Sequence, residues 1–406
     1  MMQAGAEAMP QTGRRGSAAE VFVAFLRLGL TSFGGPIAHL GYFREEFVTR
    51  RQWLDDAAYA DLVALAQFLP GPASSQVGFA LGLMRAGAAG GVAAFVGFTL
   101  PSALAMLAAA LGAGALGGPV AAGAVAGLKV VAVAIVAQAV WGMARSLCPD
   151  LPRASIAVAG AVAVSLVPGA FGQVGAIAAG LAAGLIWCRA PESGRAPGAA
   201  PRLGVPRPVA LACLAAVAAL LAVPPFLSPT GTAAFLDAVF RSGALVFGGG
   251  HVVLPLLQAG VVAPGWVAPD AFLAGYGIVQ AMPGPLFTFA GYLGAVSSAG
   301  PGGAAGAALA LGAIFLPGML LVLGAAPFWD RLSARGDARA ALRGANAAVV
   351  GILGAALHDP VFIAGVTGRA EFALALLCLA GLALWRLPVW SVVGLGALGG
   401  IVIALS

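Results

Sequence analysis

Charged residues are scarce in this sequence: Asp, Glu, Lys and Arg make up 9% of the chain, whereas hydrophobic residues make up 61%. The mean hydropathy is +0.98, and apolar runs occupy 90–112, 124–143 and 389–405. A soluble fold would leave large apolar patches exposed, so this composition excludes one. Apolar runs of about 17 to 25 residues have the length of a bilayer-spanning helix, and strand-like alternation is absent. The composition therefore predicts an all-α polytopic membrane protein in contact with the lipid bilayer.

Cysteine and histidine are also rare, and neither shows the spacing of a known site. The four cysteines lie far apart without a CxxC pair, so we expect no disulfide framework and no metal site. The three histidines form no HExxH motif, and no Gly-rich P-loop for ATP is present. These absences disfavour an intramembrane enzyme and an ATP-driven pump, and we expect no cofactor.

Almost all of the net charge of +6 comes from arginine, because Lys129 is the only lysine. A basic surplus is typical of nucleic-acid-binding proteins, but here the arginines lie between apolar runs. That placement favours cytoplasmic loops of a membrane protein and disfavours nucleic acid as a partner. The first twenty residues lack the apolar core and cleavage site of a signal peptide, so we expect a cytoplasmic N-terminus.

Glycine and proline are abundant, with 60 and 27 residues, and they recur in two copies of one pattern. The matching stretches are "QFLPGP" (67–72) with "QAMPGP" (280–285), "FLRLGLTSFGGPIAHL" (25–40) with "VFRSGALVFGGGHVVL" (239–254), 97–104 with 313–320, and 127–140 with 344–357. The matched residues include Arg, Trp, Gln, Pro and Gly rather than only Ala and Leu. We therefore interpret the chain as a duplication.

The charged loops of the two copies are exchanged. The stretch 43–56 is rich in arginine, whereas its counterpart 256–270 has no basic residue. Further along, 111–123 is uncharged, whereas its counterpart 329–343 carries four arginines. Because arginine-rich loops stay in the cytoplasm, equivalent loops should lie on opposite sides of the membrane. This pattern predicts inverted repeats, with the apolar run 209–226 supplying the additional crossing.

Four parts of the chain follow from this interpretation. We expect a cytoplasmic tail at 1–17 and a first transporter repeat at 18–188. A basic linker with one connecting transmembrane helix should occupy 189–231, and the second, inverted repeat should occupy 232–406.

The glycine and proline motifs predict two broken or re-entrant helices in each half. If the flanking arginines are all cytoplasmic, 20–43 must enter and return at "SFGGP", and 57–85 must turn at "LPGP". Irregular backbone at that depth survives only where it lines protein or water. The N–H groups that begin the next half-helix can face an anion, as in secondary transporters with inverted repeats, although packing kinks are the alternative. The glycines expected at these breaks near the midplane are Gly34, Gly35, Gly71, Gly248, Gly249 and Gly284.

Several separate motifs resemble the chromate ion transporter family in its long two-domain form. They are "SFGGPIAHLGYFREEFV", "LAQFLPGP" and "GFTLPSAL" in the first half, and "FGGGHVVLPLL", "GYGIVQAMPGP" and "NAAVVGILGAALHDPV" in the second. The resemblance implies export of chromate from the bacterial cytoplasm across the inner membrane. Chromate resistance would result, and sulfate is a related oxyanion. The substrate comes from this resemblance, whereas the residues themselves predict an inverted-repeat transporter with anion sites.

Arg27 and Arg241 occupy matching positions before the two breaks, within otherwise apolar helices. An intramembrane arginine costs about 2.5 to 3.5 kcal/mol on insertion scales, so it usually faces a cavity or a partner. A guanidinium group suits a tetrahedral oxyanion, and we expect both arginines to bind the substrate. The alternatives are snorkelling to the interface and pairing with a local acid, Glu20 or Asp237.

Ser74 and Ser75 directly follow the first PGP motif, where the second half has Leu, Phe and Thr288. Hydroxyls just past a helix start are good anion donors, although they are also ordinary N-caps. We expect these three residues to contact the anion, with the first half supplying more of the polar groups. Gln67 and Gln280 begin the two motifs, where their role is either to line the site or to hold helices together.

Three further residues are candidates because of their charge. His39 lies near the first break and can carry a proton near neutral pH. Asp61 lies in the half-helix before the first PGP motif, where it either couples proton movement to anion movement or neutralises Arg27. Lys129 is expected either to face the anion path or to snorkel to an interface.

The sequence therefore predicts a secondary oxyanion transporter that works by alternating access, and a homodimer is compatible with it. The alternative is a sulfate importer or an anion channel of the same fold, because direction and coupling depend on gradients and gating. An intramembrane enzyme is a remote alternative.

Overall fold

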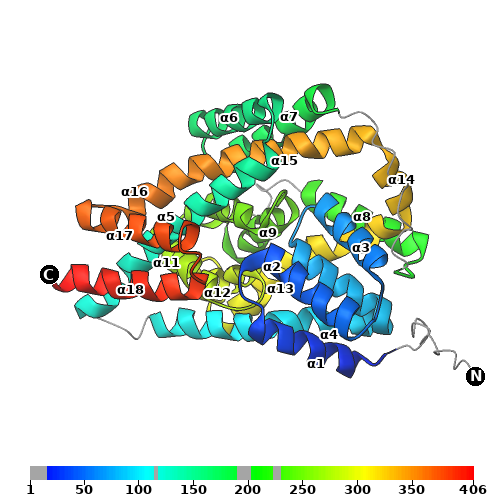
Figure 1. The fold of residues 1–406 in the computed structure, drawn as a ribbon, viewed down its shortest axis with the longest axis horizontal. Coiled ribbons are helices and arrows are strands. Elements are labelled where there is room, and N and C mark those ends of the chain that lie inside the picture. The colour runs from blue at the N-terminus through cyan, green and yellow to red at the C-terminus, as the bar shows by residue number, and fades with distance from the viewer. Residues whose placement is uncertain (1–15, 114–117, 190–202, 223–229) are drawn as a thin grey trace, which may run out of the picture.

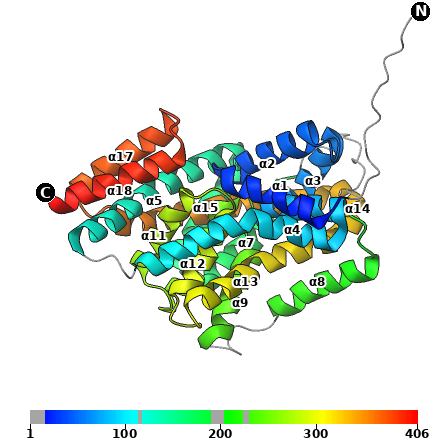
Figure 2. The same cartoon turned by 90° about the horizontal axis from the view of Figure 1, so that it is seen from below.

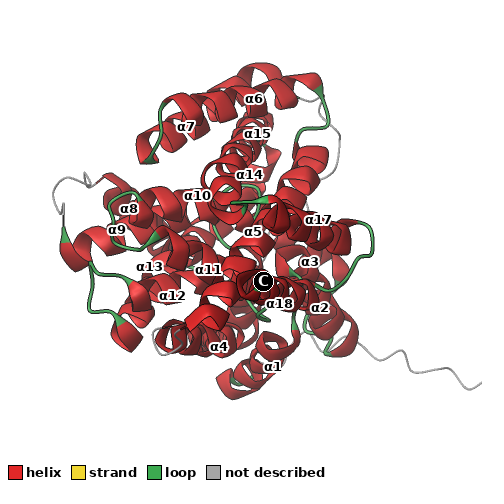
Figure 3. Cartoon of the chain, turned by 90° about the vertical axis from the view of Figure 1, so that its left-hand side faces the viewer, coloured by secondary structure: helices red, strands yellow, loops and turns green. Residues whose placement is uncertain are grey.

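The computed structural model describes residues 16–113, 118–189, 203–222 and 230–406, which form helices joined by loops (Figure 3). Within these ranges no strand occurs. Five helical stretches are long and apolar enough to cross a membrane, namely Ala73–Gly112, Gly118–Leu147, Ala170–Trp187, Gly303–Leu332 and Gly336–Gly365. The prediction of an all-α membrane protein is confirmed.

The first half of the chain runs from α1 to α7. Its elements are α1 (Ala18–Thr31), α2 (Gly35–Arg44), the π-helical turn η1 (Glu45–Arg50), α3 (Asp56–Phe68), α4 (Ala73–Ala113), α5 (Gly118–Leu147), α6 (Leu151–Leu166) and α7 (Ala170–Trp187). α4 consists of two helices that meet at a kink, where Ala86 and Gly87 have non-helical backbone angles. α8 (Arg207–Ala222) then leads to the second half and packs on its long helix α13 at one edge of the molecule (Figure 2).

The second half repeats this order. Its elements are α9 (Gly231–Ala244), η3 (Gly250–Val252), α10 (Val253–Leu257), the π-helical turn η4 (Gln258–Val262), α11 (Pro269–Gln280), η5 (Leu286–Thr288), α12 (Phe289–Val296), α13 (Gly303–Ala325), η6 (Ala326–Phe328), α14 (Trp329–Ala334), α15 (Gly336–Ala356), η7 (Leu357–Phe362), α16 (Ile363–Gly365), α17 (Arg369–Ala383) and α18 (Val389–Leu405). Thus α9 corresponds to α1, α11 to α3, α15 to α5, and the hairpin α17–α18 to the hairpin α6–α7.

The helices break at all four predicted motifs. The backbone turns there through glycines with positive φ: 99° at Gly34, 124° at Gly71, 76° at Gly248 and 93° at Gly284. A side chain is strained at such angles, which explains the glycines. In the first PGP motif, Leu69 before the first proline has extended backbone angles, as residues before proline prefer, so α3 ends there.

Finer backbone details also recur at matching positions. The π-helical turns η1 and η4 both follow the first break of their half. Just beyond them, Gln52 has a φ of 51° and Gly265 a φ of 80°. These two positions differ in residue type but share a left-handed backbone, so the likeness of the halves extends beyond the motifs.

The two halves are interleaved. The hairpin α6–α7 of the first half packs on α15 of the second half, and the hairpin α17–α18 packs on α5 of the first (Figure 1). A Cβ at Gly127 in α5 would overlap the carbonyl oxygen of Gly396 in α18. A Cβ at the matching Gly344 in α15 would overlap the carbonyl oxygen of Gly180 in α7. Small residues allow this close backbone approach between membrane helices, and here the same crossing is made twice.

Some sequence predictions fall on residues that the structure does not describe. The expected tail at 1–17 lies largely outside the described ranges, and so do 190–202 and 223–229 of the expected linker and connecting helix at 189–231; the described part of that range contains α8. The boundaries assigned to the two repeats stay predictions.

Candidate functional site

The two PGP tips each cross into the other half of the protein. In the first tip, the Gly71 N–H donates to the carbonyl oxygen of Val246, just before the second FGG break, at 2.8 Å. In the second tip, the Gly284 N–H donates to the carbonyl oxygen of Ser32, just before the first FGG break, at 2.9 Å. Gly71 matches Gly284, and Ser32 matches Val246, so these are equivalent bonds. Each tip is therefore hydrogen-bonded to the residue just before the FGG break of the opposite half.

A second pair of equivalent contacts holds the tips against the proline-containing helices α4 and α13. A Cβ at Gly71 would lie 3.2 Å from the Cα of Gly318 in α13. A Cβ at Gly284 would lie 2.9 Å from the Oγ of Ser102 in α4. Gly318 and Ser102 are themselves matching positions, one residue after the proline inside each helix. The tips therefore have room only for glycine.

The first tip carries the buried polar groups expected of an anion site. Ser74 and Ser75 in the first turn of α4 are each 3% exposed. The Ser75 hydroxyl has no hydrogen-bond partner among the described residues, although the side chain is buried. The first N–H groups of a helix have no intrahelical acceptor, and the helix dipole makes this end positive. The first turn of α4 thus offers hydroxyl and N–H donors at one place.

Gln76 ties the first tip to the second half. Its Nε2 donates to the carbonyl oxygen of Pro70 in the tip at 3.0 Å and to that of Gly318 in α13 at 3.2 Å. The side chain is completely buried, and its Oε1 has no described partner. Gln76 therefore fixes the geometry of the turn on which Ser75 stands.

His39 joins the first break to the first tip. Its Nδ1 lies 3.4 Å from the Ser74 hydroxyl, and its Nε2 lies 3.2 Å from the Ser32 carbonyl oxygen. The ring is buried and stands edge-on to Phe98 at 5.3 Å between ring centres. Since Ser32 also accepts from Gly284, one short chain of hydrogen bonds connects Ser74 to the second tip.

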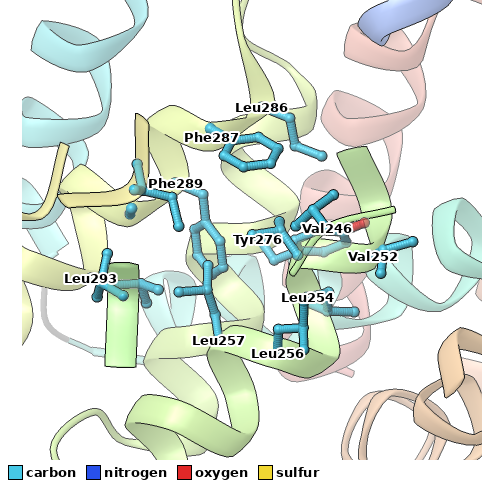
Figure 4. Close-up of a cluster of buried hydrophobic side chains, with 14 of the residues drawn as sticks. Val246, Val252, Leu254, Leu256, Leu257, Tyr276, Leu286, Phe287, Phe289 and Leu293 are labelled. Carbon is cyan, nitrogen blue, oxygen red and sulfur yellow. The ribbon is translucent and has the colours of Figure 1, made fainter. Parts of the chain in front are cut away.

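The second tip is apolar and closed. The Thr288 hydroxyl donates to the Pro285 carbonyl oxygen at 2.8 Å, so it already has an acceptor. Leu286, Phe287 and Phe289 belong to the apolar cluster around Tyr276 (Figure 4). The expected difference between the two tips is therefore visible in their side chains.

Gln280 in the second half lies one helical turn after Tyr276 in α11. The Oη of Tyr276 lies 2.8 Å from the Nδ1 of His251. The Gln280 Nε2 is buried without a described partner. Gln67, the matching residue of the first half, is exposed instead.

The two matching arginines have different surroundings. Arg27 lies on the exposed face of α1 with Val23 and Leu30, and no ion pair joins it to a described residue. Arg241 donates to Asp237 at 2.8 Å and to the Leu221 carbonyl oxygen at the end of α8 at 2.9 Å. Arg241 thus has the local acidic partner that the sequence offered as the alternative to substrate binding.

The remaining charged candidates lie away from the serines. Glu20 pairs with Arg85 at 3.1 Å rather than with Arg27. Lys129 pairs with Asp270, at the start of α11 in the other half, at 2.9 Å. Asp61 is partly exposed and makes no ion pair within the described ranges. Of the candidates in the first half, the structure brings together His39, Ser74, Ser75 and Gly71, while Arg27, Gln67, Asp61 and Lys129 lie elsewhere.

Motif comparison alone does not reveal Ser32 or Ser102 as neighbours of the second tip. Ser32 acts through its carbonyl oxygen, which every residue has, so its side chain gives no signal. Ser102 is matched by Gly318, and the only hint is that both positions hold a small residue after a helix proline.

Comparison with known proteins shows which family the sequence is similar to. The sequence model of a family described as "Chromate transporter" matches residues 19–188 and again 233–401. A chromate transport protein of Pseudomonas aeruginosa is 30% identical over 359 residues, covering 84% of this chain and 80% of that protein. One from Cupriavidus metallidurans is 29% identical over 378 residues, covering 90% and 87%. A probable chromate transport protein of Synechococcus elongatus is 28% identical over 363 residues, covering 84% and 86%. No solved structure matches the chain.

Proposed function

The chain belongs to the chromate transporter family, and we propose that it exports chromate from a bacterial cytoplasm across the inner membrane. In this proposal transport is secondary, proceeds by alternating access and confers chromate resistance, with sulfate as a competing oxyanion. Family membership supports chromate as the substrate, because the relatives that cover most of the chain are named for its transport.

One observation carries the proposed binding site: the Ser75 hydroxyl is buried in the first turn of α4 without a described partner. A buried hydroxyl left without a hydrogen bond destabilises a protein, so a ligand is a reasonable partner for it. Chromate is a tetrahedral dianion and needs several donors to replace its water. Ser74, Ser75 and the free N–H groups of this turn would supply them, aided by the helix dipole.

The second tip would complete the site mainly by its backbone. Gly284 is hydrogen-bonded to Ser32, Ser32 to His39, and His39 to Ser74. Movement of the second tip would therefore shift the position of Ser74. Its side chains are apolar, so they would exclude water from the anion rather than bind it. A low-dielectric surrounding strengthens the charge-assisted hydrogen bonds from the serines.

Alternating access is supported by the pair of equivalent bonds that fasten each tip to the opposite break. Ser74 and Ser75 are shielded here, so an anion could reach them only if the first tip moved away from α13 or from the second break. In inverted repeats such motion is a rocking of one half against the other around a fixed site. We propose that the Gly71–Val246 and Gly284–Ser32 bonds break in turn as the site opens to one side and then the other.

Proton coupling in this proposal rests on His39. A proton on His39 would place a positive charge beside Ser74, 3.4 Å away, and so favour the anion. Loss of the proton would release it. Asp61 is less suited to this role because it lies outside the cluster of His39, Ser74 and Ser75.

Uptake of labelled chromate and sulfate into everted membrane vesicles, with and without a proton gradient, tests the proposal. We expect chromate uptake whose rate changes with the proton gradient and that excess sulfate reduces. Uptake that only follows the anion's own gradient would indicate a channel, and accumulation in right-side-out vesicles alone would indicate an importer.

A further inference from the structure

The hairpin α6–α7 contains an apolar groove that the transport site does not use. It encloses about 620 Å³ and is open along one side. Residues such as Leu151, Ile156, Ala159, Ala163, Ala179 and Trp187 line it. The backs of both helices pack on α15, so the groove faces away from the second half. Figure 3 shows this hairpin at the edge of the molecule.

In the matching hairpin α17–α18, large side chains lie between the two helices, and the pocket beside this hairpin is lined by α17 together with α5, α15 and η7 rather than by α18. There the Leu374 side chain lies against Gly399, 2.6 Å from where a Cβ would stand, and Val392 lies in the same way against Gly381 at 3.3 Å. The two hairpins pack on their partner helices by the same glycine crossing. The groove is therefore not a requirement of the hairpin fold, and small residues such as Ala159, Ala163 and Ala179 leave it open.

A cluster of arginines lies at one end of the groove. Arg153 follows the groove residues Leu151 and Pro152, and Arg189 follows Trp187 by two residues. From α15, the Nη1 of Arg343 donates to the Cys188 carbonyl oxygen at 3.0 Å, which brings a third guanidinium to this end.

Two aspartates only partly balance these three arginines. The Arg153 Nε donates to Asp150 at 2.9 Å, and this bond lowers the pKa of the Asp150 carboxyl. Arg189 pairs with Asp337 at 3.2 Å. Arg343 has no carboxylate partner within the described ranges, and its bond to Cys188 uses only one of its nitrogens. One positive charge is left over, together with several N–H donors.

The length of the groove corresponds to one leaflet of a membrane. From Leu151 to Ala163, α6 rises about 18 Å at 1.5 Å per residue. Half of a hydrocarbon core of about 30 Å is about 15 Å. A groove of this length, lined by apolar residues apart from Ser155 and basic at one end, matches an acyl chain attached to a negatively charged headgroup.

We propose that the groove binds one acyl chain of an anionic phospholipid, with its headgroup phosphate on Arg153 and Arg343. Guanidinium groups bind phosphate oxygens through paired N–H donors. The arginine-rich end is expected on the cytoplasmic side, where membranes carry their anionic lipids. The lipid would wedge α6 and α7 apart while both remain packed on α15.

Native mass spectrometry of the full-length protein in detergent tests the acyl-chain part of the proposal. The protein is mixed with phosphatidylglycerol or with phosphatidylcholine of the same acyl chains. Ala159→Leu and Ala179→Leu fill the groove and should each lower retention of phosphatidylglycerol. Ala182→Leu is the matched control, because Ala182 is an exposed residue of α7 that does not line the groove.

The headgroup part is tested by neutralising the arginines. Arg153→Gln and Arg343→Gln should each lower the preference for phosphatidylglycerol over phosphatidylcholine by about fivefold, at about 1 kcal/mol per basic residue. Arg386→Gln, at the exposed turn of the filled hairpin, should leave the preference unchanged. Equal retention of both lipids by the unmodified protein would overturn the proposal, as would equal losses in the groove-filling variants and the Ala182 control.

Discussion

Ser74 and Ser75 are the side chains whose replacement tests the anion site most directly. Changing both to alanine keeps α4 and its dipole but removes two hydroxyl donors, each worth about 1.5 to 3 kcal/mol when it binds a charge. The apparent affinity for chromate should fall at least about tenfold, since about 1.4 kcal/mol is one decade. The concentration dependence of chromate uptake in everted vesicles measures this change.

Thr288→Ala is the matched control in the second tip. It should matter less, because the Thr288 hydroxyl already donates to Pro285 and lies among apolar side chains. If the double serine variant kept an unaltered concentration dependence at normal expression, the anion would bind elsewhere and the first tip would be a structural turn.

Arg27 and Arg241 should separate a transport role from a structural one. Arg241 joins α9 to the last carbonyl groups of α8, so Arg241→Ala should lower the melting temperature of the purified protein. Arg27 lies on an exposed face without an ion pair to a described residue, so Arg27→Ala should leave the melting temperature unchanged. A loss of chromate uptake in Arg27→Ala alone would keep Arg27 on the anion path. Unchanged uptake would assign it to the membrane interface.

Arg27 and Arg241 also show what the sequence can and cannot predict about a single residue. The repeat places both arginines at equivalent points, but the partners of Arg241 include α8, which occurs once and packs mainly on α13 of the second half. Likewise, Gln280 matches Gln67 in sequence, yet the Gln280 Nε2 is buried whereas Gln67 is exposed. Repetition predicts the backbone of a position, whereas its neighbours depend on side chains that differ between the halves and on elements outside the repeats, such as α8.

At the scale of elements, the glycine crossings between α5 and α18 and between α15 and α7 should be needed for stability. Gly127→Leu and Gly344→Leu each place a side chain where a carbonyl oxygen of the opposite helix lies. Overpacking of this kind costs about 1 to 3 kcal/mol. Both variants should therefore show a lower melting temperature in detergent.

The same helices supply the controls for this test. At Gly142 in α5 and Gly354 in α15, an added Cβ would meet nothing within 4 Å, so their leucine variants should keep normal stability. Equal destabilisation at Gly142 and Gly127 would mean that glycine matters for the helix itself and not for the crossing.

The helix breaks were predictable from sequence, but the pairing of the helices was not. Glycine and proline fix the backbone locally, so "SFGGP" and "LPGP" identify where α1 and α3 must end. A row of small residues shows that a helix has a close neighbour without saying which one. The packing of α6–α7 on α15, and of α17–α18 on α5, therefore becomes visible only in the structure.

For the whole molecule, several equivalent contacts point to a twofold relation between the halves. The tip bonds of Gly71 and Gly284 are exchanged between the halves, and so are the hairpins that pack on α5 and α15. In addition, a Cβ at Gly250 would lie 3.2 Å from Pro36, the residue that Gly250 matches in the repeat. A contact between two matching residues is expected only near an axis of symmetry.

A twofold axis in the membrane plane would turn one half upside down relative to the other, which the exchanged arginine-rich loops also predict. Single cysteines at Gln52 and Gly265, both exposed and at matching positions, test this. They are introduced into a protein whose four native cysteines are replaced. A membrane-impermeant thiol reagent should label Gln52→Cys only in everted vesicles and Gly265→Cys only in intact spheroplasts. Labelling of both from one side would place the axis along the membrane normal, and the rocking of inverted halves proposed for transport would then have no structural basis.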